Sequence, residues 1–239
     1  MKESSPMKLV LASFAIPIFA VSAILTQPLA AQNPELQQKI ADVKMVAAMN
    51  KQALAQYTYV QTTTISIKGD VKKVTHDQVV TGPDGKPQKT SLDPPPAPPS
   101  GGRLRQHVVE KKTDEFTDYA DSIKTLIQQY LPPDTDMIQQ AASQGNIALG
   151  PTGAPGVIQL VISNYIKQGD KMTLVVNKAA GGLQSVSIAT YLSDPSDAVT
   201  VNVQFAAIPG GPNHPSTITI NGVSKQMTIV NQNGSYRHL

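Results

Sequence analysis

The spacing of apolar residues along the chain separates helical segments from strands. Across Pro34–Ala55, apolar residues recur every three or four positions, which predicts an amphipathic helix. Across Tyr57–Lys68 the period falls to two, and the β-branched content favours a strand. Val71–Thr81 returns as its partner, and Pro87–Leu92 is expected to add a short third strand. The first third of the chain therefore predicts one helix followed by a small antiparallel sheet.

Helical spacing returns in the middle of the chain, and strand spacing dominates its end. Helices are expected at Val109–Tyr130 and Asp134–Gln144, with Pro132-Pro133 ending the first of them. Six strands joined by short turns follow, and these are Val157–Ile166, Lys171–Asn177, Leu183–Leu192, Ala198–Ala206, Ser216–Ile220 and Ser224–Val230. Short turns join antiparallel neighbours, because a parallel crossover needs a dozen residues or more.

These elements predict an α+β fold. We expect a wide, curved antiparallel sheet of about nine strands, an incomplete β-barrel, covered by about three helices. Residues 32–239 then form a single domain, because the sheet has one apolar face that only the helices can cover. Two alternatives stay open at this stage. Either the helices pack fully against that face, or part of it lines a cavity for an apolar ligand.

One segment cannot belong to the sheet interior. Asp93–Arg103 contains five prolines and two glycines, and proline has no N–H to donate to a strand ladder. The segment is therefore predicted to be an exposed loop or a semi-rigid spacer. Its functional alternative is a polyproline ligand for a partner domain.

The N-terminus has the three parts of an export signal. Lys2 and Lys8 form a short basic region, the apolar run Leu9–Leu25 follows it, and the small residues Ala30-Ala31 come after the run. This predicts a signal peptide of residues 1–31. A transmembrane anchor is the alternative, but a 17-residue run containing proline is short for a span. We expect a periplasmic or secreted protein that is not a lipoprotein, because the chain has no cysteine to carry lipid.

Composition and motifs exclude several functions. The chain has 239 residues and a net charge of only +3, without the concentrated basic stripe of a nucleic-acid binder. No two of the four histidines have helical i, i+4 spacing, and no nucleophile elbow, P-loop or dinucleotide fingerprint occurs. His214 lies in a segment rich in proline, glycine and asparagine and is expected in a loop. The sequence predicts no catalytic residue, metal or cofactor.

Candidates for lining an apolar cavity are aliphatic and aromatic residues on the faces expected to point inward. Tyrosine suits such a site because it offers an apolar ring and a polar tip, although it also caps the edges of ordinary cores. The candidates are Ile40, Val43, Tyr57, Tyr59, Tyr165, Tyr191 and Phe205.

The order of elements resembles a known family of envelope proteins. The first helix, the Tyr57–Thr81 hairpin, the middle helices and the Asn213–Ile218 approach to a late strand resemble the LolA/LolB lipoprotein carriers and MucB-type sensor domains. The segments Ala53–Tyr59 and Tyr191–Pro195 are similar to uncharacterised exported proteins of soil bacteria. The resemblance implies an incomplete antiparallel barrel lidded by helices, with a cavity that holds acyl chains.

Three functional hypotheses follow. The first is an exported, non-enzymatic binding protein that shelters an apolar or acylated ligand, lipid or lipoprotein-like, between sheet and helices. The second is an envelope interaction or sensor module that docks a partner protein through a sheet edge or the proline-rich loop. The third is a hydrolase with an unrecognised site, for which polar residues capable of chemistry are sparse.

Overall fold

A computed structural model describes residues 33–83, 85–95, 103–178 and 182–239 of the chain. The expected signal peptide, residues 1–31, lies outside the described residues. The elements follow in the order α1 (Pro34–Leu54), β1 (Tyr57–Ile67), β2 (Asp70–Thr81), β3 (Pro87–Ser91), α2 (Arg103–Ile127), α3 (Thr135–Ser143), β4 (Ile147–Leu149), β5 (Val157–Ser163), β6 (Lys171–Asn177), β7 (Gly182–Tyr191), β8 (Ala198–Ala207), β9 (Asn213–Gly222) and β10 (Met227–His238).

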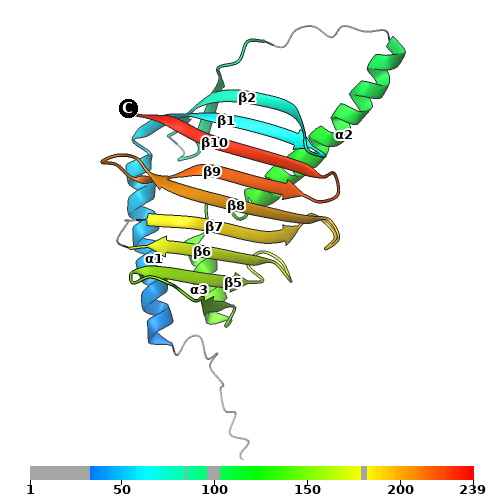
Figure 1. Ribbon diagram of the computed structural model, residues 1–239. Coiled ribbons are helices and arrows are strands. Elements are labelled where there is room, and N and C mark those ends of the chain that lie inside the picture. Colours follow the sequence, from blue (N-terminus) through cyan, green and yellow to red (C-terminus); the bar gives the residue numbers. More distant parts are fainter. Residues whose placement is uncertain (1–32, 84, 96–102, 179–181) are drawn as a thin grey trace, which may run out of the picture.

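The ten strands form one open sheet, ordered β3-β2-β1-β10-β9-β8-β7-β6-β5-β4, with antiparallel pairing throughout. The sheet is not closed into a barrel, and the three helices lie behind it in Figure 1. The predicted α+β class and wide antiparallel sheet are confirmed. The strand beyond the expected nine is β4, whose three residues are too few to show an alternating pattern.

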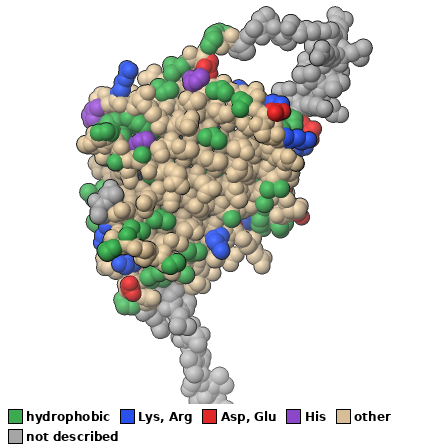
Figure 2. Space-filling view, viewed as in Figure 1, with side chains coloured by type: hydrophobic (Ala, Val, Ile, Leu, Met, Phe, Trp, Pro, Cys, Tyr) green, Lys and Arg blue, Asp and Glu red, His purple; other side chains and the backbone are tan. Residues whose placement is uncertain are grey.

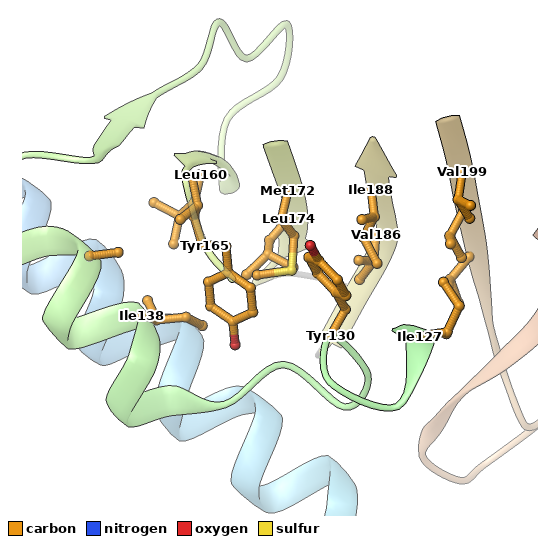
Figure 3. Close-up of a cluster of buried hydrophobic side chains, with 14 of the residues drawn as sticks. Ile127, Tyr130, Ile138, Leu160, Tyr165, Met172, Leu174, Val186, Ile188 and Val199 are labelled. Atoms are coloured by element: carbon orange, nitrogen blue, oxygen red, sulfur yellow. The ribbon is translucent and has the colours of Figure 1, made fainter. Parts of the chain in front are cut away.

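The core lies between the helices and the sheet half formed by β4–β9. Buried and partly buried residues alternate along β5 and β6, as a strand with one covered face requires. Figure 3 shows side chains of β5–β8 meeting Ile127, Tyr130 and Ile138 from the helical layer. The helices therefore pack against much of the inner face of the sheet.

The second helix begins earlier than its sequence pattern indicates. It starts at Arg103 rather than Val109, and its first half projects beyond the sheet in Figure 1. Its second half packs closely on the sheet at Gly222, where an added Cβ would lie 2.7 Å from Ile123 Cδ1 and from the Tyr119 hydroxyl oxygen. Glycine leaves room for the Ile123 and Tyr119 side chains, which would have to shift to accommodate any other residue there.

The first helix is covered mainly in its N-terminal half. Asn33 caps it by accepting a hydrogen bond from the Leu36 N–H, and Ile40 and Val43 are buried. The expected apolar stripe does not continue to Met49, which is 67% exposed. The neighbouring Asn50 instead faces the sheet, where it makes the polar contacts described below.

The last two strands are longer than expected, and one turn is displaced. Asn221-Gly222, expected as a two-residue turn, ends β9 instead, and the chain turns over residues 223–226. His214, expected in a loop, lies in β9 and is only 7% exposed. β10 continues to His238 because a bulge in its pairing with β1 accommodates Ser235 and Tyr236 opposite Tyr59, and the φ of Ser235 is 54°.

The outer face of the sheet is polar and carries few charges. Figure 2 shows this face with charged side chains mainly towards its margins. Strand register places a Ser187–Asn202–Thr219 row across β7, β8 and β9, and Ser187 donates to Asn202 at 3.0 Å. Such polar side chains are expected on the hydrated face of a sheet whose other face is buried.

The proline-rich segment is anchored at its start. Asp93 accepts a hydrogen bond from the His76 N–H at 2.7 Å, and its second oxygen lies 2.8 Å from His76 Nδ1. Pro94 and Pro95 are exposed, and residues 96–102 lie outside the described residues. The predicted loop at Asp93–Arg103 is therefore described only at its two ends, and the rest of it stays a prediction.

Deleting Pro94–Gly102 and bridging the gap with Gly-Ser is expected to change the free energy of unfolding by no more than about 0.5 kcal/mol. The reason is that prolines outside the sheet contribute little to packing, while Asp93 and its contact with His76 are retained. Chemical denaturation of both chains measures the difference. A loss of several kcal/mol would show that the segment is packed.

Candidate functional site

One rim of the sheet lies alongside the first helix. In Figure 1, α1 passes along the side where β1, β7 and β9 begin and β6, β8 and β10 end. We call this the α1 rim, and its strand-end residues are Tyr57, Asn177, Gly182, Ala207, Asn213 and His238. It is where the apolar interior of the sheet reaches the surface beside a helix.

An asparagine pair holds the C-terminal half of α1 to the rim. Asn50 Nδ2 donates to the Asn213 carbonyl, and the Asn213 N–H donates to Asn50 Oδ1, both at 2.7 Å. The Asn213 side chain in turn donates to the Leu183 carbonyl at 2.7 Å. A Cβ on Gly182 would come within 2.6 Å of Asn213 Nδ2, so glycine leaves the space this side chain occupies.

Replacing Asn50 with alanine removes both hydrogen bonds to Asn213 and is expected to cost about 1–2 kcal/mol, because each such bond contributes on the order of 1 kcal/mol. The loss should be local. Amide hydrogen exchange is expected to accelerate over residues 46–54 and to stay unchanged around Ile40, which is packed in the core. Uniform acceleration along α1 would contradict a separately attached C-terminal half.

An ion pair holds the middle of α1. Lys178 Nζ lies 2.8 Å from Asp42 Oδ2, just beyond the end of β6, and Gln38 donates to the other carboxylate oxygen. The hydrogen bond from Lys178 holds the pKa of Asp42 below its ordinary value. The charged form of Asp42 is therefore favoured in the folded protein.

The contact between Asp42 and Lys178 predicts a pH dependence for the attachment of α1. Because folding lowers the pKa of Asp42, its contribution to stability is complete above the ordinary carboxyl pKa. That contribution is lost as the pH falls through the lowered value. Acid titration followed by hydrogen exchange in α1 is expected to show this loss in the wild type. The Asp42→Asn variant should lack it, and an unchanged acid response in that variant would contradict the assignment.

A hollow of about 210 Å³ opens at the rim beside the asparagine pair. Its lining comes from the ends of β6, β7, β8 and β9, namely Asn177, Gly182, Leu183, Gln184, Phe205, Ala206, Ala207 and Asn213. Leu183 and Phe205 are partly buried and pack against the main core. The hollow thus continues the core to the surface.

Aromatic rings also lie on the strands next to the hollow. His214 follows Asn213 of the hollow lining and pairs with Ala206 in the ladder, and its ring lies 4.1 Å from the Tyr236 ring, centroid to centroid. Tyr236 stacks on Tyr59 at 4.9 Å. We call Phe205, His214, Tyr236 and Tyr59 the aromatic row. Its members come from β8, β9, β10 and β1 and lie far apart in sequence.

Beyond the aromatic row the inner face of the sheet becomes polar. Gln61 donates to Asn233 and Thr63 donates to Asn231, both at 2.8 Å. Lys89 of β3 donates to Gln61. The inner face of β1 and β10 is therefore polar at Gln61, Thr63, Asn231 and Asn233, next to the aromatic row, and apolar again at Ile65, Ile67, Met227 and Ile229.

The structure places the seven predicted cavity residues in three groups. Ile40, Val43 and Tyr165 are buried in the main core, where the Tyr165 ring lies 5.9 Å from that of Tyr130. Tyr59 and Phe205 belong to the aromatic row. Tyr57 is close by, because its ring contacts that of His238 at 5.1 Å and its hydroxyl group approaches Gly211.

Tyr191 stands apart from the other candidates. It ends β7 on the side opposite the rim, its hydroxyl donates to the Gln168 carbonyl at 3.0 Å, and Lys167 Nζ lies 4.7 Å from its ring centre. The rim consequently combines three of the seven predicted residues, Tyr57, Tyr59 and Phe205.

Two rim residues, His214 and Tyr236, were not predicted from the sequence. The Pro- and Gly-rich run before His214 reads as a loop, and the last strand was expected to end at Val230, before Tyr236. No alternation of apolar and polar residues continues beyond Val230, because Asn231, Gln232 and Asn233 form a polar run.

The described residues also bear on metal binding and on membrane insertion. Within residues 33–83, 85–95, 103–178 and 182–239, no group of three or more His, Asp and Glu side chains is placed to hold a metal ion. In the same residues, no helix is both long and apolar enough to cross a bilayer.

Comparison with solved structures finds similar proteins over most of the chain. A DUF1329 family protein from Desulfovibrio piger aligns with 83% of this chain and 92% of its own, at 11% identity and a TM-score of 0.42. A LolA superfamily protein from Nitrosomonas europaea aligns with 82% and 93%, at 10% identity and a TM-score of 0.38. A putative outer membrane lipoprotein-sorting protein domain from Vibrio parahaemolyticus aligns with 83% and 93%, at 8% identity and a TM-score of 0.39.

One of these structures belongs to the LolA superfamily, the family that the order of elements in the sequence resembles. No protein-family model and no curated protein matches the chain.

Proposed function

We propose that this protein is an exported, non-enzymatic binding protein that shelters an apolar or acylated ligand between its sheet and α1. The observation that supports this proposal most directly is the hollow at the α1 rim, where Phe205 and Leu183 extend the core to the surface. Beside it, the partly exposed rings of Tyr59 and Tyr236 stack on each other, and the buried His214 ring contacts Tyr236. Such a concave, mostly apolar site with a few polar groups is the usual form of a ligand site.

The size of the hollow implies that α1 moves when a ligand binds. Ligand sites usually measure about 300–1,000 Å³, and the hollow is smaller, at about 210 Å³. The contacts of α1 divide it into two parts. Its N-terminal half is buried through Ile40 and Val43, whereas its C-terminal half is held by the Asn50–Asn213 pair and leaves Met49 exposed. We propose that the C-terminal half opens to enlarge the hollow.

Tyr57, Tyr59 and Phe205 then form the lining of the site. Ile40 and Val43 belong to the packed core behind it, and Tyr165 belongs to the core at the opposite end of β5. We propose export to a periplasm or the cell exterior on the basis of the N-terminal sequence pattern. An absence of catalysis is proposed because the described rim consists of aromatic, aliphatic and amide side chains rather than a nucleophile beside a base.

Fluorescence of the neutral apolar dye N-phenylnaphthylamine tests the proposal. The native wild type is expected to enhance its emission, and Phe205→Ser is expected to weaken binding about tenfold or more, because burial of a phenylalanine is worth about 1.5–3 kcal/mol. Tyr191→Ser is the matched control, since Tyr191 lies at the opposite end of β7. No enhancement by the folded wild type, or equal losses in both variants, would contradict the proposal.

A docking function is the second candidate, and the β3 edge supports it. All five residues of β3 are exposed, and this strand ends one edge of the sheet. Exposed edges can accept a strand from a partner. A docking protein would change its size with its partner in solution and would not enhance the fluorescence of the dye.

A further inference from the structure

Two polar atoms in the aromatic row are buried without a hydrogen-bond partner. They are Nδ1 of His214 and the hydroxyl oxygen of Tyr236, whose rings are 4.1 Å apart. His214 is only 7% exposed. Buried polar atoms in a folded protein nearly always have a partner, so two without one on neighbouring rings are exceptional.

The surroundings of this pair explain why the protein does not satisfy it internally. The nearby Pro215 carbonyl already accepts a hydrogen bond from Asn233 Nδ2 at 2.8 Å. Tyr59 presents its ring face to Tyr236 in a stacked contact. The neighbours of the pair therefore offer ring faces or polar groups that are already engaged.

Burial favours the uncharged form of both members of the pair. Burial lowers the pKa of His214, and the Pro215 carbonyl opposes this effect only in part. Burial raises the pKa of Tyr236 and that of Tyr59. A series of hydrogen bonds leads from the Pro215 carbonyl through Asn233 and Gln61 to Lys89. Lys89 is the first charged side chain along this series.

We propose that His214 and Tyr236 bind the uncharged, hydroxyl-bearing head of an acyl lipid whose chain lies in the apolar site under α1. This inference rests on the proposed function and names its ligand class. A hydroxyl group both donates and accepts, so it can satisfy the imidazole nitrogen and the phenol together. A carboxylate would be buried here without a cation, which is unfavourable.

The position of the pair fits this ligand class. Tyr59 and Tyr236 of the aromatic row lie beside the polar part of β1 and β10, formed by Gln61, Thr63, Asn231 and Asn233. A chain in the hollow beside Phe205 would place an attached glycerol group towards His214, Tyr236 and the amides beyond them. An acylglycerol has this succession of apolar chain and uncharged polar head.

Competition against N-phenylnaphthylamine tests the inference. Monolauroylglycerol is expected to displace the dye from the wild type at a concentration about five- to tenfold lower than methyl laurate, which has the same chain without hydroxyl groups. Laurate, with its carboxylate, is expected to compete more weakly than monolauroylglycerol. In Tyr236→Phe and in His214→Phe/Tyr236→Phe, monolauroylglycerol should lose its advantage over methyl laurate, while dye binding remains.

Thermal melting gives a second readout that a purely structural role would not produce. Tyr236→Phe removes an unpartnered hydroxyl group, so its melting temperature should equal or exceed that of the wild type. A lower melting temperature would show that the hydroxyl group is already satisfied, for example by water, and would overturn the inference. Tyr191→Phe, at the opposite end of β7 and outside the site, is the control and should keep the preference for monolauroylglycerol.

The outcomes separate this inference from the function on which it rests. Dye binding without any preference among the three lipids overturns the head-group assignment and leaves the binding function in place. Failure of the wild type to bind the dye overturns both. Preference for laurate over monolauroylglycerol overturns the uncharged character assigned to the site.

Discussion

Truncating Ile40 to alanine is expected to lower the free energy of unfolding by about 2–5 kcal/mol, the usual cost of removing a buried aliphatic side chain. Ile40 is 1% exposed and belongs to the core cluster that joins α1 to the sheet. Met49→Ala is the matched control on the same helix. Met49 is 67% exposed, so its loss should change stability by no more than about 0.5 kcal/mol.

Urea denaturation of the wild type and both variants gives the comparison. Equal, small losses would show that no part of α1 is packed and that the whole helix is a mobile cover. A large loss for Ile40→Ala with retained dye binding is the result we expect, because the site opens at the other half of the helix.

Replacing Asp170 with alanine is expected to be similarly damaging, at about 3–5 kcal/mol, because it removes one acceptor from several buried donors. Asp170 is 2% exposed and accepts hydrogen bonds from the N–H groups of Tyr165, Ile166 and Lys167 at 2.6, 2.9 and 2.9 Å. It also accepts one from the Tyr130 hydroxyl at 2.6 Å. This carboxylate therefore joins the β5–β6 connection to the segment that follows α2.

Tyr130→Phe serves as the graded comparison for Asp170→Ala. It removes only one of the four donors and should cost about 1.5–3 kcal/mol, the value for a hydrogen bond to a charged group. Thermal and chemical denaturation of both variants measure the losses. If Asp170→Ala cost no more than Tyr130→Phe, the backbone contacts of Asp170 would not be stabilising the fold.

The regular elements of this protein were predictable because their side chains repeat with a clear period. The alternation of Val199, Val201 and Val203 identified β8 and its buried face, and the structure has all three buried. Helices and hairpins depend on neighbours close in sequence, so local patterns carry their signal. The α+β class, the antiparallel sheet and the need for a helical cover follow from these patterns.

The candidate site was only partly predictable because contacts distant in sequence create it. Tyr59 and Tyr236 meet because β1 pairs with β10, and no local pattern indicates that pairing. Asn50 and Asn213 are 163 positions apart, and neither residue is distinctive in sequence. His214 was assigned to a loop because proline and glycine precede it, whereas pairing with β8 draws it into a strand.

Entry of an apolar ligand under the C-terminal half of α1, which the Asn50–Asn213 pair holds to the rim, can be tested within one molecule. The chain has no cysteine, so an Asn50→Cys/Asn213→Cys variant can form only one intramolecular disulfide, which would lock α1 to the rim. Gel mobility reports that bond, and melting curves report that both redox forms are folded.

The measurement is the affinity for N-phenylnaphthylamine before and after reduction. If α1 opens at the rim, the oxidised protein loses dye binding, and reduction restores binding to the level of the Asn50→Ala variant. Equal binding by the locked and the reduced forms would contradict an opening under α1.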